Sequence, residues 1–306
     1  MDKLFKSTIL QLYGDEGKKW LEELPSLLAD LEKRWQFKIL NPFSHLTYNY
    51  VLKVSLFGSS AAVLKCGVPY AKINTEIAAL KHFNGEGSIK LLEADAELGV
   101  MLLEEALPGR TLFEIKDDEK ETEIFANVIS RLHKPLQHNA DFPTVQQWFE
   151  GLTRFSQAGG ASPFPLKLID EACKIGKELI DSMGKPVLLH GDLHHMNILS
   201  ATRESWLAID PKGVVGEREY EVGAFMRNPI PALTTKMDTK KILTRRIEIL
   251  TDMTGFDKKR IIGWSFSQAV LAAIWCFEDM GAGFEPFIQC AEVLREIDKA
   301  LDTVNK

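Results

Sequence analysis

The spacing of apolar residues changes near residue 36 and again near residue 111. Residues 3–35 place apolar side chains at helical intervals, with an interruption at Gly14 and a new helix expected to begin at Pro25. Residues 36–67 instead carry short apolar runs separated by turn residues. These runs predict three successive antiparallel strands, over 37–40, 50–56 and 61–66.

A helix over about 72–82 and two more strands over 89–93 and 98–104 complete a predicted five-stranded sheet. The pattern breaks at 104–110, so we place a domain boundary between residues 105 and 106. The sequence therefore predicts an α+β protein, with a small sheet-containing lobe over 1–105 that has a helical N-terminal extension, and a mostly helical lobe over 106–306. Helices in the second lobe are expected over 111–135, 166–182, 240–254, 257–279 and 286–303.

The stretch 187–212 interrupts this helical lobe with strand character and polar side chains. A short apolar run, Val187 to Leu189, predicts a buried strand that ends at His190, and Asp192 follows two residues later. Asn197 then precedes a predicted hairpin over 198–209, which ends on Asp210. One loop and one hairpin thus gather three side chains that carry oxygen atoms.

The order of these three side chains matches the needs of phosphoryl transfer. A carboxylate must orient the attacking hydroxyl, and hard oxygen ligands must hold Mg²⁺ against the triphosphate. We therefore expect Asp192 to be the catalytic base, Asn197 and Asp210 to be metal ligands, and ATP and Mg²⁺ to be the cofactors. Any one of these residues could instead be a turn or capping residue, so the hypothesis depends on all three together.

A metal-dependent hydrolase is a weaker interpretation of the same stretch. His190, His194 and His195 cluster around Asp192, but the other histidines are scattered along the chain without paired acidic ligands. A two-metal centre would need such partners.

Lys65 and Glu76 form a second candidate pair. Lys65 ends the third predicted strand in AlaValLeuLys, and Glu76 lies on the apolar face of the helix that follows. A buried carboxylate without a counter-charge is costly, which favours an ion pair with Lys65. The alternative is that Glu76 reaches water and Lys65 is an ordinary residue of an edge strand.

These motifs resemble the aminoglycoside phosphotransferase (choline kinase-like) group, which has a two-lobe protein kinase-like fold. The shared elements are HisGlyAsp at 190–192, Asn197, Asp210 and the AlaValLeuLys strand. The segments AspProLys at 210–212 and ArgAsnPro at 227–229 bring the chain closest to the streptomycin 6-kinase and hydroxyurea-kinase branch. The chain departs from the branch at Glu221, where Asp is usual, and ProLys follows Asp210 at the place where kinases have PheGly. The resemblance covers about residues 15–295.

The resemblance implies an ATP-dependent O-phosphotransferase that acts on a hydroxyl of streptomycin or a related cationic aminoglycoside, and so confers antibiotic resistance. Lys65, oriented by Glu76, would bind the α- and β-phosphates, while the Glu104 carbonyl and the Ala106 amide would contact adenine. The first loop of the sheet lacks GxGxxG, so Ser44, Thr47 and backbone amides would have to replace it. His190 and His194 would shape the catalytic loop, with His195 nearer the substrate.

Glu278 and Asp279 are candidate ligands for a cationic substrate. They end a predicted helix, where the helix dipole disfavours acids, and aminoglycoside-type enzymes use carboxylates from this region. A solvated helix end is the equal alternative. Trp264 and Trp275 on the same helix are expected in the core rather than against a substrate.

Composition narrows the partners and the location. The net charge of −6 makes nucleic acid an unexpected partner, and four cysteines without metal or CxxC spacing indicate reduced core residues. The longest apolar run, 269–277, is too short to cross a bilayer, so we expect a cytoplasmic protein without a membrane partner.

Two other functions stay open at this point. The first is a kinase of another small metabolite, such as choline, a sugar or a hydroxyurea-like compound, and the second is a non-catalytic nucleotide-binding module. A protein kinase is disfavoured because an AlaProGlu segment and a recognisable activation loop are missing from the sequence.

Overall fold

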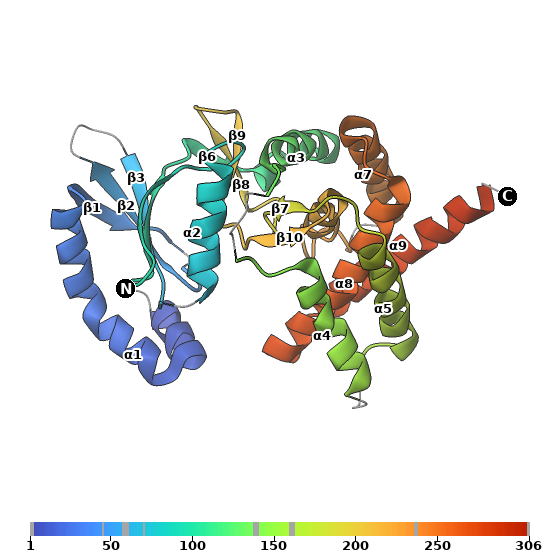
Figure 1. Ribbon diagram of the computed structural model, residues 1–306, viewed down its shortest axis with the longest axis horizontal. Helices are drawn as coiled ribbons and strands as arrows, with labels where there is room; N and C mark the ends of the chain where they lie inside the picture. The colour runs from blue at the N-terminus through green and yellow to red at the C-terminus, as the bar shows by residue number, and fades with distance from the viewer. Residues whose placement is uncertain are drawn as a thin grey trace. The chain divides into compact units, whose positions relative to one another are not determined.

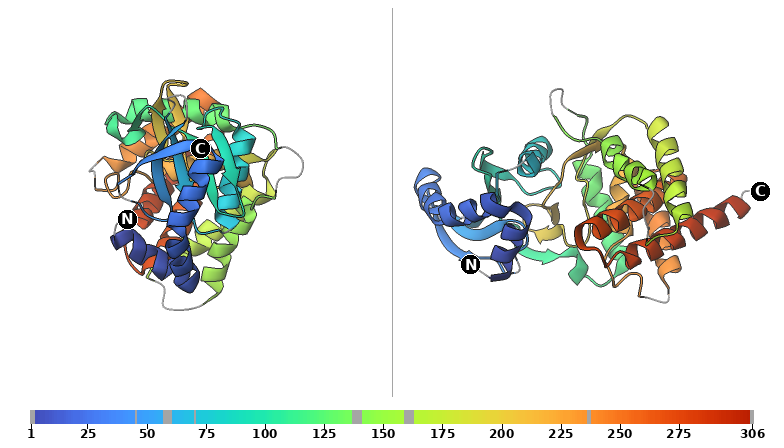
Figure 2. Two further views of the ribbon diagram at one scale, coloured as in Figure 1. Left: turned by 90° about the vertical axis from the view of Figure 1, so that its left-hand side faces the viewer. Right: turned by 90° about the horizontal axis from the view of Figure 1, so that it is seen from below.

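The computed structural model describes residues 3–44, 46–56, 61–69, 71–136, 141–158, 163–235 and 238–304. The chain divides into two compact units, Met1–Leu107 (unit 1) and Pro108–Lys306 (unit 2). This division lies two residues after the boundary expected between residues 105 and 106. Figures 1 and 2 show the helices and strands of each unit.

Unit 1 contains an antiparallel sheet of five strands in the order β1-β2-β3-β5-β4. All five predicted strands are therefore present, and they form the antiparallel sheet that was expected. The sheet is built from β1 (Phe37–Pro42), β2 (Tyr50–Leu56), β3 (Ala61–Cys66), β4 (Leu91–Asp95) and β5 (Val100–Glu104).

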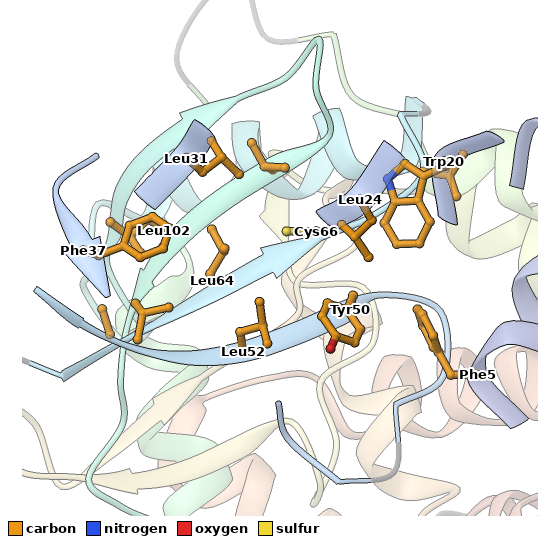
Figure 3. Close-up of a cluster of buried hydrophobic side chains, with 14 of the residues drawn as sticks. Phe5, Trp20, Leu24, Leu31, Phe37, Tyr50, Leu52, Leu64, Cys66 and Leu102 are labelled. Carbon is orange, nitrogen blue, oxygen red and sulfur yellow. The ribbon is translucent and has the colours of Figure 1, made fainter. Parts of the chain in front are cut away.

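The two faces of this sheet have different partners because side chains alternate along a strand. On β3, Leu64 and Cys66 join a buried apolar cluster with α1 (Lys3–Arg34), in which Phe5, Trp20, Leu24 and Leu31 also take part (Figure 3). Lys65 points to the opposite face, where it meets α2 (Ala71–Phe83). The sheet thus presents one charged side chain of β3 to a helix.

The prediction that Pro25 begins a new helix is wrong, because Pro25 lies inside α1. Leu24 and Leu31, on either side of it, are buried against the sheet, so packing outweighs the local cost of proline. The expected interruption at Gly14 is present, with φ 52° and ψ −128° there. Such a positive φ is easiest for glycine.

Unit 2 contains two small sheets around the predicted catalytic stretch. Strand β7 (Val187–Leu189) pairs with β10 (Val214–Gly216), and β8 (Ile198–Ala201) lies between β6 (Pro108–Thr111) and β9 (Trp206–Ala208). The hairpin β8–β9 was predicted. Strands β6 and β10 were not, because each is short and carries proline or glycine.

The rest of unit 2 is helical, and α8 (Lys258–Met280) lies at its centre. Helix α8 packs against α4, α5, α6 and α9, and its run beside α9 is visible in Figure 2. Among the described residues α8 has the length and apolarity of a membrane span, but 72% of its most apolar window is buried within the protein. The helices are α3 (Asp118–Leu132), α4 (Val145–Gln157), α5 (Leu166–Asp181), α6 (Val222–Met226), α7 (Thr239–Thr254), α8 and α9 (Glu285–Val304), with 3₁₀ turns at Leu112–Glu114 and Arg218–Glu221.

Candidate active site

A sharp turn after β7 delivers Asp192. Gly191 has φ 82°, and a Cβ there would lie 2.9 Å from both Trp148 Cη2 and Val214 Cγ1. Only glycine meets both the positive φ and this close approach without displacing its neighbours. Asp192, the candidate base, therefore directly follows a position at which only glycine fits.

Glu221 fixes this turn through the backbone. Its carboxylate is 1% exposed and accepts hydrogen bonds from the His190 amide (2.6 Å) and the Gly191 amide (2.9 Å). Burial alone would raise the pKa of this carboxyl, but the side chain of His133, whose Nε2 lies 3.6 Å from Glu221 Oε2, the nearby His190 and the Gly191 amide hold its pKa below the usual value. Glu221 is thus a buried anion that binds the start of the catalytic loop.

His190 ties the loop to the end of the β8–β9 hairpin. Its Nε2 donates to the Ile209 carbonyl at 2.7 Å, so Nε2 carries the proton and Nδ1 accepts from the Asp192 amide at 3.3 Å. Its carbonyl accepts from the amides of Lys212 and Gly213, at 2.8 and 3.2 Å. Burial lowers the pKa of His190, which agrees with this neutral tautomer. The expectation that His190 shapes the loop agrees with these contacts.

Hydrogen bonds tie Asn197 to Asp192, and tie the residue before Asp210 to Asn197. Asn197 Nδ2 donates to the Asp192 carbonyl at 2.9 Å, which directs the amide oxygen of Asn197 away from that carbonyl. The Ile209 amide donates to the Asn197 carbonyl at 3.0 Å, so the residue directly before Asp210 is fixed against Asn197. Asp210 adopts φ 59°, a left-handed conformation that aspartate tolerates better than most residues.

This donor set suits Mg²⁺ shared with phosphates. Asn197 and Asp210 offer hard oxygen atoms, the ligand type that Mg²⁺ prefers. Within the described part of the chain, no group of three or more His, Cys, Asp or Glu side chains is placed to hold a metal ion. Proteins usually supply only one or two ligands to a Mg²⁺ ion whose octahedral coordination is completed by phosphate oxygens and water.

Two nitrogen-bearing side chains face one oxygen of Asp192. Arg227 Nη2 lies 3.6 Å from Asp192 Oδ1, and His194 Nε2 lies 4.0 Å from the same atom. His194 Nδ1 accepts from the Met196 amide at 3.2 Å, and burial lowers the pKa of His194 to about 4. Sequence reasoning did not find Arg227, although its ArgAsnPro segment was noted without a role for the arginine.

His195 lies in the interior of unit 2 and is 0% exposed. Its ring stacks on Phe225 at 4.4 Å between centroids, and its Nε2 lies 3.5 Å from Glu121 Oε2 and 3.3 Å from Arg246 Nη2. Arg246 in turn pairs with Asp118 at 2.6 Å. This burial favours a structural position for His195 over the expected place near the substrate.

In unit 1, Lys65 and Glu76 are in direct contact. Lys65 Nζ lies 2.7 Å from Glu76 Oε1 and 2.9 Å from Oε2, and the two residues are 4% and 8% exposed. The carboxylate on the apolar face of α2 thus has the cation that its burial requires.

The other nucleotide-binding candidates of unit 1 differ in exposure. Ser44 and Thr47 are exposed in the loop between β1 and β2, where backbone and hydroxyl groups can meet a ligand. Glu104 ends β5, and its side chain accepts from the Lys90 amide at 2.9 Å. Ala106 is half-buried and follows this strand by two residues. Their contacts with adenine or phosphate stay predictions.

Glu278 and Asp279 are exposed on the last turn of α8. Trp275, one turn earlier, is half-buried and meets Trp148 edge to face at 5.8 Å between ring centroids. Trp148 is the residue that Gly191 closely approaches. An aromatic pair therefore links the catalytic loop to the helix that carries the two acids. Trp264, by contrast, is fully buried, as expected.

Comparison with known proteins agrees with this geometry. The model of the aminoglycoside/hydroxyurea antibiotic resistance kinase family matches residues 38–281. The chain is 29% identical to streptomycin 6-kinase of Streptomyces glaucescens, covering 92% of this chain and 93% of that one. It is also 29% identical to hydroxyurea phosphotransferase of Kitasatospora aureofaciens, covering 93% and 83%.

The fold is similar to that of choline kinase LicA from Streptococcus pneumoniae, with a TM-score of 0.63 at 15% identity over 90% of this chain and 99% of that one. The predicted two-lobe kinase-like fold is therefore confirmed.

Proposed function

The chain belongs to the aminoglycoside/hydroxyurea antibiotic resistance kinase family, and we propose that it transfers the γ-phosphate of ATP to a hydroxyl of streptomycin or a related aminoglycoside. The observation that carries the proposal is the fixed order of Asp192, Asn197 and Asp210 in one hydrogen-bonded loop and hairpin. The names of the relatives support the choice of acceptor: two streptomycin 6-kinases at 29% and 28% identity and a streptomycin 3''-kinase at 30%.

Asp192 orients the acceptor hydroxyl and takes its proton. The hydroxyl oxygen forms a bond to the γ-phosphorus, the bond from that phosphorus to the β,γ-bridging oxygen breaks, and ADP leaves with the bond electrons. Asp192 is half-buried at the end of the turn fixed by Glu221, so its carboxylate is held and still reachable. General-base assistance of this kind contributes about 10²–10⁴-fold.

Asn197 and Asp210 would hold Mg²⁺, which when bound neutralises charge on the triphosphate. Lys65 binds the α- and β-phosphates of ATP, and Glu76 keeps its ammonium group in place. The Glu104 carbonyl and the Ala106 amide contact adenine through the backbone. The exposed Ser44 and Thr47 stand in for a glycine-rich phosphate loop.

Glu278 and Asp279 receive a cationic acceptor. They are exposed, and the aromatic pair Trp148–Trp275 connects their helix to the turn before Asp192. His195 packs in the interior of unit 2, next to the catalytic loop, and does not touch the acceptor, because its side chain is fully buried. We place the reaction in the cytoplasm, where ATP is available, and assign the chain no nucleic-acid or membrane partner.

A second acceptor class is favoured by one observation. The hydroxyurea phosphotransferase of Kitasatospora aureofaciens is as similar to this chain, at 29% identity, as the first streptomycin 6-kinase. The catalytic residues above serve either acceptor, because the base and the phosphate ligands act on groups that both reactions share. Only the acceptor-binding surface of unit 2 separates the two functions.

Mass spectrometry of parallel incubations tests the proposal. Streptomycin, hydroxyurea, choline and a hexose are each mixed with the protein, ATP and Mg²⁺, with Asp192→Asn as the matched inactive control. We expect streptomycin to gain one phosphoryl group with the wild-type protein and none with the variant. Transfer to another acceptor alone would replace streptomycin in the proposal. ATP binding without transfer to any acceptor would favour the non-catalytic nucleotide-binding module.

A further inference from the structure

We infer that Arg227 is a positioning residue for Asp192: it holds one carboxylate oxygen, so that the other faces the acceptor hydroxyl. The inference rests on the proposed function, because it needs Asp192 to be the base. Arg227 Nη2 lies 3.6 Å from Asp192 Oδ1. The Asp192 side chain is 30% exposed, whereas the Arg227 side chain is 9% exposed. The buried guanidinium of Arg227 therefore lies on the interior side of the more exposed Asp192 carboxylate.

A second side chain lies on the side of the same oxygen. His194 Nε2 also lies nearest to Asp192 Oδ1, at 4.0 Å. Within the described residues, Oδ2 of Asp192 makes no hydrogen bond or ion pair. A carboxylate held at one oxygen cannot turn freely about its Cβ–Cγ bond, so Oδ2 stays directed to the open side. Orientation of a reacting group is a large part of catalytic rate enhancement.

Arg227 is itself fixed on the side away from Asp192. Its Nη1 donates to Gln268 Oε1 at 3.1 Å, and Gln268, 5% exposed on α8, donates through Nε2 to the Tyr220 carbonyl. Gly223 leaves room for this side chain, since a Cβ there would lie 2.4 Å from Gln268 Cδ. The guanidinium is thus anchored by a neutral amide whose other end is bound to backbone.

The backbone around Arg227 is also held. Arg246 donates to the Phe225 carbonyl at 2.9 Å and to the Asn228 carbonyl at 2.7 Å, on either side of Arg227. Asn228 Nδ2 donates to the Ala224 carbonyl at 2.9 Å. These contacts set the place from which Arg227 reaches Asp192.

Stability alone would not select this arrangement. A buried guanidinium loses hydration, and apolar side chains of similar volume are commonly as stabilising as a buried charge pair. The guanidinium of Arg227 contacts the neutral amide of Gln268 through Nη1 and faces the half-buried carboxylate of Asp192 through Nη2. Its position is therefore explained by what it does to the base.

Steady-state kinetics on Arg227→Met test the inference. We expect kcat to fall about 10- to 100-fold, while KM for streptomycin and the affinity for Mg·ATP change by less than about threefold. Arg227→Lys keeps the charge near Asp192 but not the planar fork, and we expect it to recover part of the lost kcat. Gln268→Ala loosens the anchor and is expected to lower kcat less than Arg227→Met does.

Arg260→Met is the matched control. Arg260 is also a guanidinium of unit 2 bound to a buried carboxylate, because its Nε lies 2.8 and 3.1 Å from the two oxygens of Glu217. Its other side-chain hydrogen bonds within the described residues go to Ser182 and Leu179, outside the catalytic loop. We expect a lower melting temperature and an unchanged kcat. A purely structural Arg227 would behave in the same way, which would overturn the inference. Full kcat in Arg227→Met, or equal losses in kcat and Mg·ATP affinity, would also overturn it.

The failure of the proposed function has a different signature. In that case the wild-type protein phosphorylates none of the acceptors. The same variants are then compared in the slow hydrolysis of ATP by water, which also needs a base to orient the attacking oxygen. A rate lowered about 10-fold or more in Arg227→Met, and raised again in Arg227→Lys, would support the positioning role. An unchanged rate would overturn it.

Discussion

Unit 1 and unit 2 each bury a glutamate that fixes another part of the same unit, and the two glutamates bind different kinds of partner. Glu76 in unit 1 binds the ammonium of Lys65, a side chain 11 residues away in the sequence. Glu221 in unit 2 binds the backbone amides of His190 and Gly191, at separations of 31 and 30 residues. Glu76 positions a charged side chain that we propose binds the phosphates of ATP. Glu221 positions a stretch of backbone that leads to Asp192, the proposed base.

The difference explains why one of the two was predictable. A carboxylate within an apolar helix face needs a cation, and a lysine at the end of the preceding strand supplies one, so Glu76 and Lys65 could be paired from the sequence. Every residue except proline has an amide, so the partners of Glu221 leave no signature in side-chain types. Glu221 could be noted only as the acid at a position where the family usually has aspartate.

The largest expected effect is that of Glu221→Gln. Glutamine has one acceptor oxygen, and its NH₂ group would face the second backbone amide, donor against donor. The negative charge to which the two backbone amides donate would also be lost. We expect unit 2 to lose about 4 kcal/mol of unfolding free energy and kcat to fall by at least about 100-fold. Urea unfolding and transfer kinetics measure these changes.

The matched control for that variant is Glu248→Gln, on the exposed side of α7, which should be nearly neutral. If Glu221→Gln is equally mild, the backbone clamp is not what holds the loop, and the contrast between the two glutamates fails.

Glu76→Gln should have the next largest effect. Lys65 would lose its anionic partner at a position where it is 4% exposed. We expect about 3 kcal/mol of destabilisation and a fall of about 10- to 100-fold in kcat/KM for ATP, with KM for the acceptor unchanged. Glu93→Gln, an exposed site on β4 of the same sheet, is the control. A change in the KM of the acceptor would mean that Glu76 does not act through the phosphates.

The predictable parts of the fold are those in which a periodic apolar pattern fixes the element. The five strands of unit 1, the β8–β9 hairpin and the long helices belong to this group. Strand β10 was missed because its three residues carry no period, and its position is set by pairing with β7. Pro25 was misjudged because the burial of its neighbours in α1 outweighs its local preference.

The same distinction holds within the site. Asp192, Asn197 and Asp210 could be selected from the sequence because the proposed phosphoryl transfer needs those side chains in that order. Arg227 and His195 were harder to assign, because α6, α7 and α8 bring their partners from distant segments. No local pattern shows that Gln268 anchors one and that Phe225 covers the other.

The pH dependence of stability gives a smaller effect within unit 2. Burial lowers the pKa of His194 to about 4 in the folded protein, whereas an unfolded histidine has its ordinary pKa of about 6.5. The unfolded chain therefore binds more protons between these values, and the stability contributed by neutral His194 is present above pH ~6.5 and lost as pH falls towards ~4. At pH ~5 the loss is about 2 kcal/mol.

Urea unfolding of the wild-type protein and of His194→Asn, at a series of pH values, measures this contribution. The variant should lose less stability between pH ~8 and pH ~5 than the wild-type protein does. Some dependence will remain, because burial also lowers the pKa of His190. Identical pH profiles for the two proteins would mean that His194 does not resist protonation in the folded loop.

The smallest expected effect returns to unit 1 and to an ion pair at its surface. Arg34 Nη1 lies 2.7 Å from Asp95 Oδ2, the same separation as in the Lys65–Glu76 pair, but the Arg34 side chain is 57% exposed. The hydrogen bond from Arg34 holds the pKa of Asp95 below its usual value, yet water screens an exposed pair. We expect Arg34→Ala to cost about 0.5 kcal/mol, less in high salt, with unchanged kinetics. Urea unfolding at two salt concentrations measures it. A loss of unfolding free energy as large as that of Glu76→Gln would show that burial does not account for the difference between the two ion pairs. The stabilisation by the Lys65–Glu76 contact would then have to come from its other neighbours in unit 1.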